Sequence, residues 1–174
     1  QSMRSAFYNP SALYRRAVEA ERALQAARRT VAAPVGAREE NVVFTSGGTE
    51  SDNLAVFGTL GTLRGTGRVL YTAAEHPAVK NACREAAVRY GLTAEEIPLT
   101  ARGSLDHEAF RAMLGPDIKL ICVMQVCNET GAIMPVAEVA KLRDVLAPEA
   151  TIHVDGVQGY LRVPFSMRET NVQT

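Results

Sequence analysis

The chain has 174 residues, 47% of them hydrophobic, and its 19 basic and 19 acidic side chains give a formal net charge of zero at pH 7. This length and apolar content suit one domain with one substantial core. A neutral chain without a basic block argues against nucleic acid or an anionic membrane as the main partner. No apolar run approaches the length of a membrane span, and no signal-peptide pattern opens the sequence.

The three cysteines, Cys83, Cys122 and Cys127, form no Cys-x-x-Cys motif and no Cys/His cluster. Cys83 and Cys122 lie in apolar patterns typical of a helix and a strand, which indicates buried free thiols. This cysteine usage fits a protein of the reducing cytoplasm and does not fit a structural metal site.

The first part of the chain predicts a helix, a strand and a second helix. Residues 11–33 carry an apolar stripe at three- and four-residue intervals, which indicates an amphipathic helix entered through a turn at Asn9-Pro10-Ser11. Val42–Phe44 predicts a short buried strand, and a helix follows over residues 50–63. Residues 58–67 fit a frayed helix end and loop better than a second phosphate loop, because no Lys-Ser/Thr follows. The predicted stripe of the first helix comprises Leu13, Ala17, Ala20, Leu24, Ala27 and Val31.

The remaining elements alternate strand and helix. The predicted strands lie at 68–72, 94–97, 119–126 and 151–154. Between them lie three predicted helices: one opened by Glu75-His76-Pro77, one at 106–114 capped near Ser104 or Asp106, and one opened by Pro135. The apolar stripe of the last helix comprises Val136, Val139, Ala140, Val145 and Leu146. This alternation predicts an α/β fold of three layers, with a mostly parallel sheet covered on both faces. In such folds ligands bind at the carboxyl ends of the strands.

A glycine turn at 45–50, Thr-Ser-Gly-Gly-Thr-Glu, directly follows the apolar run that ends at Phe44. A glycine turn that opens a helix presents free backbone N–H groups to an anion, so this segment predicts a phosphate site. Glu50 suits the helix dipole but would repel a bound phosphate. We therefore expect the Glu50 side chain to point away from the phosphate.

The strand at 151–154 ends in Asp155, and Gln158 follows three residues later. Opposite a pyridine nitrogen, the Asp155 carboxylate would keep that nitrogen protonated. A protonated ring is the electron sink of pyridoxal phosphate chemistry. Asn128 and Gln158 can hydrogen bond a ring hydroxyl, and His76 can stack on a planar ring or transfer a proton.

Each of these residues also has a simpler interpretation. An Asp after a strand is usually a turn former or a helix cap, and Asn128 before Glu-Thr-Gly suits an ordinary turn. His76 can be a polar residue at a helix start. His153 shares a strand face with Asp155 and either faces the ligand or packs in the interior. The joint arrangement after successive strands favours the functional interpretation.

The sequence resembles the cysteine desulfurases in motif, order and spacing. Four segments carry this resemblance: Phe44–Asn53, Glu75–Val79, Asn128–Gly131 and His153–Asp155 with Gln158. These are class V enzymes of the aspartate-aminotransferase fold, with pyridoxal phosphate as cofactor. The resemblance implies conversion of L-cysteine to L-alanine and an enzyme-bound persulfide, which supplies iron–sulfur cluster or thiolation pathways. It also implies a homodimer and a sulfur-acceptor or scaffold protein as partner. The implied site residues are Gly48 and Thr49 at the phosphate, His76 stacking on the ring and sharing acid–base steps, Asn128 and Gln158 near the ring hydroxyl, and Asp155 at the ring nitrogen.

The sequence departs from the family pattern at several positions. Cys127 stands where the family commonly has Asn, Tyr14 where a histidine is frequent, and Gly156-Val157 replaces the usual small pair. Pyridoxal phosphate enzymes need a lysine for the Schiff base, yet none of the three lysines stands in the expected Ser-x-His-Lys context. The persulfide-forming loop cysteine and the small domain are also missing. We therefore expect residues 1–174 to be part of the large domain, inactive alone and without a covalent link to the cofactor.

Two other functions remain open from the sequence. One is another class V enzyme, such as a selenocysteine lyase or a small-molecule aminotransferase. The other is a non-catalytic binding or dimerisation module, which the exposed edge of an incomplete sheet would favour.

Overall fold

The computed structural model of the protein describes residues 7–63 and 65–174. The chain divides into two compact units. The first contains the chain up to Phe44 together with Phe165–Arg168, and the second contains Thr45–Pro164 and Glu169–Thr174. No helix in the described residues is both long enough and apolar enough to cross a membrane.

The first unit is built on helix α2, Arg15–Ala32, which packs against the short 3-10 turns Ala33–Val35 and Glu39–Asn41. The predicted helix is confirmed from Arg15 onward, but its predicted entry is wrong. Tyr14 occupies the N-cap without a side-chain hydrogen bond, and the Asn9 side-chain Oδ1 instead accepts the Ser11 N–H at 2.9 Å in a separate turn.

The predicted apolar stripe of α2 is largely not buried. Ala17 and Ala32 are the buried residues of the helix, whereas Leu13, before its first turn, is 98% exposed. Periodicity marks the apolar face of a helix, but burial also needs a neighbouring element that covers this face. In the described residues of the first unit, the elements that pack against α2 are the short 3-10 turns Ala33–Val35 and Glu39–Asn41.

The predicted buried strand at Val42–Phe44 is wrong. The backbone is extended at Val42, but no described strand pairs with this segment, and Val43 and Phe44 are 65% and 49% exposed. Branched and aromatic side chains favour an extended backbone, yet a strand also requires a partner for its hydrogen bonds.

The second unit contains a parallel sheet in the order β2-β1-β3-β4. Its strands are β1 Arg68–Thr72, β2 Thr93–Ile97, β3 Ile118–Cys122 and β4 Thr151–His153. The predicted fold class and all four predicted strands of this unit are confirmed. The strand predicted at 119–126 ends early at Cys122, but the Val123 and Gln125 N–H groups still donate to His153 and Asp155 carbonyls beyond it.

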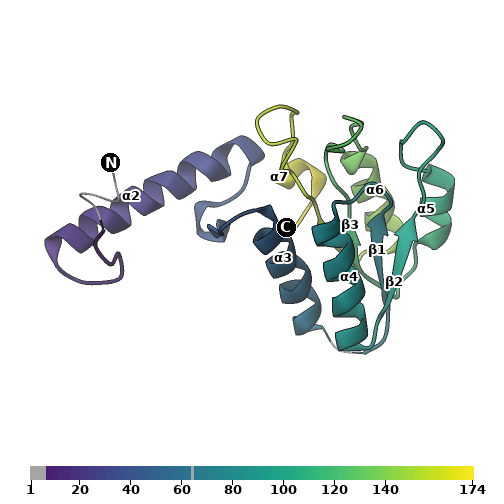
Figure 1. Cartoon of the computed structure of the whole chain (residues 1–174), viewed down its shortest axis with the longest axis horizontal. Helices are drawn as coiled ribbons and strands as arrows, with labels where there is room; N and C mark the ends of the chain where they lie inside the picture. The colour runs from purple at the N-terminus through teal and green to yellow at the C-terminus, as the bar shows by residue number, and fades with distance from the viewer. Residues whose placement is uncertain (1–6, 64) are drawn as a thin grey trace. The chain divides into compact units, whose positions relative to one another are not determined.

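Helices cover both faces of this sheet. The helices after α2 are α3 Gly48–Thr62, α4 Pro77–Tyr90, α5 His107–Met113, α6 Val136–Leu146 and α7 Met167–Thr170. Helices α3 and α4 lie side by side on one face (Figure 1). The right-handed connections expected between parallel strands direct α5 and α6 to the other face. The order of α3 to α6 agrees with the predicted alternation, with Asp106 as the cap of α5. The short helix α7 has no counterpart among the predicted elements.

One core cluster lies between the sheet and the α3–α4 layer. Cys83 on α4 and Cys122 on β3 are fully buried free thiols, as the sequence predicts. Their Sγ atoms lie 3.5 Å apart, a contact that the sequence does not predict. Burial raises the pKa of Cys122 well above its usual range. On α6 the stripe is buried at Val136, Val139 and Ala140, but the prediction for Val145 is wrong, because this residue is 76% exposed on the outer side of the helix.

A charged cluster links the beginning of β1 to the middle of β2 and to the residue that precedes β3. Arg68, the first residue of β1, donates from Nε and Nη2 to Asp117 at 2.6 and 3.0 Å and from Nη1 to Glu95 of β2 at 3.0 Å. These hydrogen bonds hold the pKa of Asp117 below its usual value. Gly67 fits this crowded point because a Cβ there would lie 2.5 Å from the Asp117 carbonyl oxygen.

Candidate active site

All predicted site residues belong to the second unit. They open a helix or follow a strand, as the sequence predicts. Gly48 and Thr49 begin α3, His76 caps α4, Asn128 lies after β3, and Asp155 and Gln158 lie after β4. In a parallel sheet these positions share the edge formed by the carboxyl ends of the strands.

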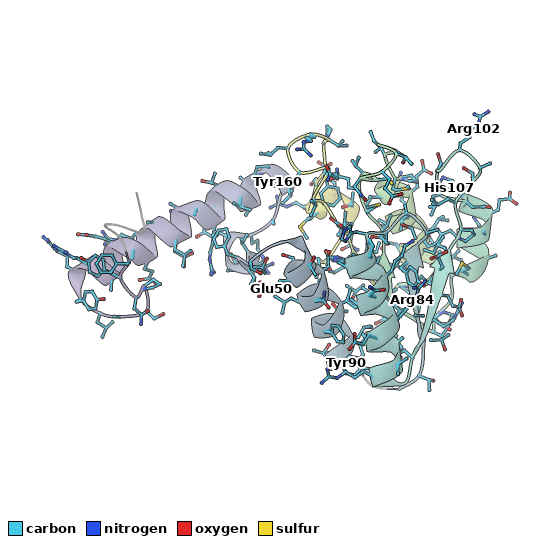
Figure 2. All side chains as sticks on the ribbon, in the orientation of Figure 1. Glu50, Arg84, Tyr90, Arg102, His107 and Tyr160 are labelled. Carbon is cyan, nitrogen blue, oxygen red and sulfur yellow. The ribbon has the colours of Figure 1, made fainter. Side chains whose placement is uncertain are left out.

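The amino end of α3 is organised by Glu50. Glu50 Oε2 accepts hydrogen bonds from the Ser46 N–H and the Ser46 hydroxyl, both at 2.6 Å. These bonds lower the pKa of Glu50. In Figure 2 Glu50 lies at the beginning of α3. The carboxylate is thus directed back onto Ser46, while the N–H groups of Gly48 and Thr49, by position, lack an intrahelical acceptor.

Gly48 lies directly against the loop that carries Asp155. A Cβ built on Gly48 would lie 3.1 Å from Val157 Cγ2. The absence of a side chain at Gly48 therefore allows the beginning of α3 and the loop after β4 to approach closely. The structure brings the predicted phosphate site and the Asp155 loop together.

Asp155 is only 8% exposed. Its Oδ1 accepts the Val157 N–H at 2.9 Å, so the simpler interpretation of Asp155 as a turn former is correct for this oxygen. No hydrogen bond within the described part of the chain engages Oδ2. A buried carboxylate with one free oxygen is suited to a cationic partner.

His76 is exposed at the N-cap of α4, where its Nδ1 accepts the Ala78 N–H at 3.1 Å. The interpretation of His76 as a polar helix-start residue is therefore correct, and its ring remains accessible. Because Nδ1 accepts a hydrogen bond, the proton of the neutral ring lies on Nε2.

Asn128 and Gln158 are less closely tied to the other predicted residues. Asn128 is exposed in a turn closed by the Gly131 N–H, which donates to the Cys127 carbonyl at 2.8 Å. Gln158 Oε1 accepts from Arg162 Nη1 at 3.1 Å. Within the described residues, neither side chain makes a hydrogen bond to Asp155.

Glu75 is a site residue that the sequence reasoning missed. It is 3% exposed, and its Oε1 accepts from the Thr72 hydroxyl at 2.8 Å and from the Met124 N–H at 2.6 Å. Burial, opposed by these two hydrogen bonds and assisted by the charges of Asp155 and Asp52, raises the pKa of Glu75 to about 7. Its position beside His76 was the available signal, but neither its burial nor its partner Met124, two residues after β3, follows from the local sequence.

His153 packs inside the unit. Its Nε2 lies 3.4 Å from Asp52 Oδ1 on α3, and its Nδ1 lies 3.2 Å from the Thr174 hydroxyl. Both His153 and Asp52 are 5% exposed. Of the two interpretations of His153, packing in the interior is the one that the structure supports. Asp52 has no signal in the sequence beyond its place in the second turn of α3.

Gln125 is a third missed residue. Its backbone N–H donates to the Asp155 carbonyl at 2.9 Å, and its side-chain Nε2 donates to the Val163 carbonyl at 3.3 Å. Gln125 therefore connects the end of β3 to both ends of the loop after β4.

This donor set fits pyridoxal phosphate. The fit rests on the nearly buried carboxylate of Asp155 for a ring cation and on the amino end of α3 for a phosphate, joined where Gly48 meets the loop after β4.

A family model described as aminotransferase class-V matches residues 2–173. The chain belongs to the class-V aminotransferase family. Class-V aminotransferases and cysteine desulfurases depend on pyridoxal phosphate.

The relatives of this class-V chain include cysteine desulfurases. It is 37% identical over 167 residues to a cysteine desulfurase of Cereibacter sphaeroides, covering 95% of this chain and 43% of the relative. It is 34% identical to the cysteine desulfurase NifS of Azotobacter vinelandii, covering 95% and 41%. The chain thus spans less than half the length of these relatives.

Two solved structures resemble the class-V chain closely. A NifS-like protein aligns with a TM-score of 0.89 at 28% identity, covering 99% of this chain and 47% of that one. A structure described as SspA in complex with cysteine also has a TM-score of 0.89, at 26% identity, covering 99% and 49%. These comparisons confirm the resemblance to cysteine desulfurases and the aspartate-aminotransferase-like fold.

Proposed function

We propose that this chain is part of a pyridoxal-phosphate-dependent cysteine desulfurase, an enzyme that converts L-cysteine to L-alanine and retains the sulfur as a persulfide. The observation that carries the proposal is the nearly buried Asp155 carboxylate on a loop that packs against the amino end of α3. Similarity to named cysteine desulfurases supports the choice of reaction within the class-V family.

The phosphate of the cofactor binds at the amino end of α3. The Gly48 and Thr49 N–H groups and the positive end of the helix dipole provide its ligands. Glu50 supports this role because its carboxylate is held by Ser46, so that its charge is directed away from the first amides of the helix.

Asp155 would hold the ring of the cofactor through the ring nitrogen. When bound, pyridoxal phosphate supplies an electron sink that stabilises negative charge on the substrate carbon. Asp155 holds the proton on the ring nitrogen by its charge. Asn128 and Gln158 would hydrogen bond on the hydroxyl side of the ring, and Gln158 would then give up its hydrogen bond with Arg162.

His76 stacks on the ring and takes part in proton transfer. Its Nδ1 is engaged by the Ala78 N–H, so Nε2 carries the proton of the neutral ring and is the atom from which it is donated. The exposure of His76 leaves this atom accessible to substrate.

Residues 1–174 form part of the large cofactor-binding domain, which acts in a homodimer and passes sulfur to an acceptor or scaffold protein in the cytoplasm. The cysteine named with one structural neighbour supports L-cysteine as substrate, and the three free thiols support a reducing compartment.

The test is an assay of the full-length protein containing this chain, supplied with pyridoxal phosphate and L-cysteine. We expect alanine and, with a thiol reductant, sulfide to form in equal amounts. Asp155→Asn should abolish most of the activity, whereas Glu149→Gln, at an exposed carboxylate, should not change it. Turnover of L-selenocysteine without turnover of L-cysteine would instead identify a selenocysteine lyase.

A further inference from the structure

Glu75 has a buried carboxyl group that the proposed function does not yet use. Its Oε1 receives two hydrogen bonds, from Thr72 at the end of β1 and from Met124 after β3, and its own N–H donates to the Thr72 carbonyl at 3.0 Å. Its Oε2 is buried and has no partner among the described residues. The group is thus fixed through one oxygen while the other faces the interior.

The contacts of Glu75 link several segments of the site. Glu75 precedes His76, whose backbone begins α4. Met124 precedes Gln125, whose N–H donates to the Asp155 carbonyl at 2.9 Å. The carboxyl group therefore connects the His76 turn, the end of β3 and, through the next residue, Asp155.

The charged groups that act on Glu75 are all acidic. Asp155 after β4 and Asp52 on α3 both raise the pKa of Glu75, although burial is the larger cause. Cys122 on β3 is affected in turn by Glu75 and Asp52, and His153 on β4 lies 3.4 Å from Asp52. From β1 the neighbour is the neutral Thr72 hydroxyl, and the titratable residue next in the chain is His76. A change of charge at Asp155 is therefore felt directly at Glu75.

We propose that Glu75 is a positioning residue of the cofactor site whose carboxyl group ties the His76 turn to the end of β3 and releases its proton to solvent when a cationic ring binds at Asp155. The inference rests on the proposed function, since it takes a protonated pyridine ring as the cation. No bond other than the O–H bond of Glu75 breaks in this step.

The direction of the effect follows from linkage. A cation at Asp155 offsets one of the two negative charges that keep the Glu75 proton bound, so the bound state holds fewer protons than the free state. Reciprocally, loss of this proton increases the affinity of the site for the cation. Affinity for the cofactor should therefore rise with pH near neutrality by more than the cofactor's own titration explains.

The experiment measures proton release when pyridoxal phosphate binds to the full-length apoprotein, by calorimetry at pH 7 in two buffers of different ionisation enthalpy. Glu75→Gln keeps the Oε1 acceptor for Thr72 and Met124 but has no titratable proton. We expect the wild type to release more protons per bound cofactor than Glu75→Gln, with a difference of up to about one proton. Glu108→Gln, at an exposed carboxylate on α5, should match the wild type.

Two further readouts test the same proposal. The infrared difference spectrum of the wild type should lose a protonated-carboxyl band when the cofactor binds, which requires no variant. The induced circular dichroism of bound cofactor, which reports its stacking, should weaken in Glu75→Ala and be retained in Glu75→Gln.

The outcomes separate the two proposals. If the wild type and Glu75→Gln both bind pyridoxal phosphate with equal proton release, or if the infrared band does not change, the role of Glu75 is overturned and the proposed function stands. If the wild type does not bind pyridoxal phosphate at all, the proposed function fails and the role of Glu75 fails with it.

Discussion

Two glutamates show how neighbouring groups decide the charge of one residue type. Glu50 is exposed and receives two hydrogen bonds from Ser46, which stabilise its carboxylate and lower its pKa. Glu75 also receives two hydrogen bonds, but burial outweighs them and raises its pKa. The loss of water thus matters more at Glu75 than the donors that replace it.

Asp155→Asn tests the ion pair at the ring nitrogen. The amide keeps an Oδ1 acceptor for the Val157 N–H but loses the charge, so the turn should persist. We expect affinity for pyridoxal phosphate to fall about tenfold or more, since about 1.4 kcal/mol of ion-pair energy corresponds to a factor of ten. An absorbance titration of the full-length protein measures this, with Glu149→Gln as control. Equal affinity of variant and wild type would contradict the assignment of Asp155.

Glu75→Gln should change how the stability of the protein depends on pH. The pKa of Glu75 is about 7 in the folded state against an ordinary value of 4.5, so the folded state binds the extra proton between these two values. Wild-type stability therefore decreases as pH rises from 4.5 to 7, and the glutamine variant lacks this decrease. Between pH 4.5 and pH 7, we expect the free energy of unfolding of Glu75→Gln to rise by about 3 kcal/mol relative to that of wild type.

Urea unfolding at pH 5 and pH 8 measures this gain. The free energy of unfolding of Glu75→Gln minus that of wild type should be larger at pH 8. A difference that is the same at both pH values would mean that Glu75 is already ionised at pH 5.

At the scale of elements, the loop after β4 is held by a close contact. A Cβ built on Gly159 would lie 1.9 Å from Gln125 Oε1 and 2.3 Å from its Cδ, whereas a Cβ on Gly156 has its nearest neighbour at 3.9 Å. Gln125 is 4% exposed and bonded to Val163, so its side chain has little room to move aside. The loop that carries Asp155 is therefore shaped by the Gln125 side chain from the segment that follows β3.

Gly159→Ala should destabilise the protein by about 1–3 kcal/mol because it overpacks this contact. Gly156→Ala, with an open Cβ position, should cost much less. The double variant Gln125→Ala/Gly159→Ala should be more stable than the sum of the two single effects, because removal of the Gln125 side chain removes the clash. Thermal unfolding of the four proteins gives the coupling energy, and strict additivity would show that the two residues do not meet.

The sequence predicts those elements whose pattern and partners lie close in the chain. Hydrophobic periodicity and turn-forming residues locate α3, α4 and the four strands. The tendency of ligands to bind at the carboxyl ends of parallel strands points to Asp155 and to the beginning of α3. Val42–Phe44 and the α2 stripe are predicted wrongly because burial depends on a covering element that local sequence does not contain. Glu75 and Gln125 escape prediction for the same reason, since their partners come from distant segments.

At the scale of the whole molecule, burial is concentrated in the second unit. Strands β1 and β3 have a strand on each side, and their residues are almost all buried between helices. In the first unit, α2 buries only Ala17 and Ala32. Stability against local opening should differ accordingly.

Hydrogen exchange of the 174-residue chain, followed by mass spectrometry, should show this difference. We expect the amides of β1 and β3 to exchange slowest and those of α2 among the fastest, because opening of α2 exposes little apolar surface. Equal protection of α2 and β1 would show that α2 is covered in solution by a surface that its own unit does not provide.

The contacts of Arg68 with Asp117 and of Glu75 with Met124 each join residues 49 positions apart, one at the beginning and one near the end of the β1–β3 pair. Closing a loop of this size costs chain entropy before any contact repays it, so long-range pairings of this kind slow folding. The His76 turn cannot be tied to β3 until the whole segment through β2 and α5 has folded back. Chains that collapse before this pairing would have the amino end of α3 but no complete ring site, so tight cofactor binding should follow the slow folding step and not precede it.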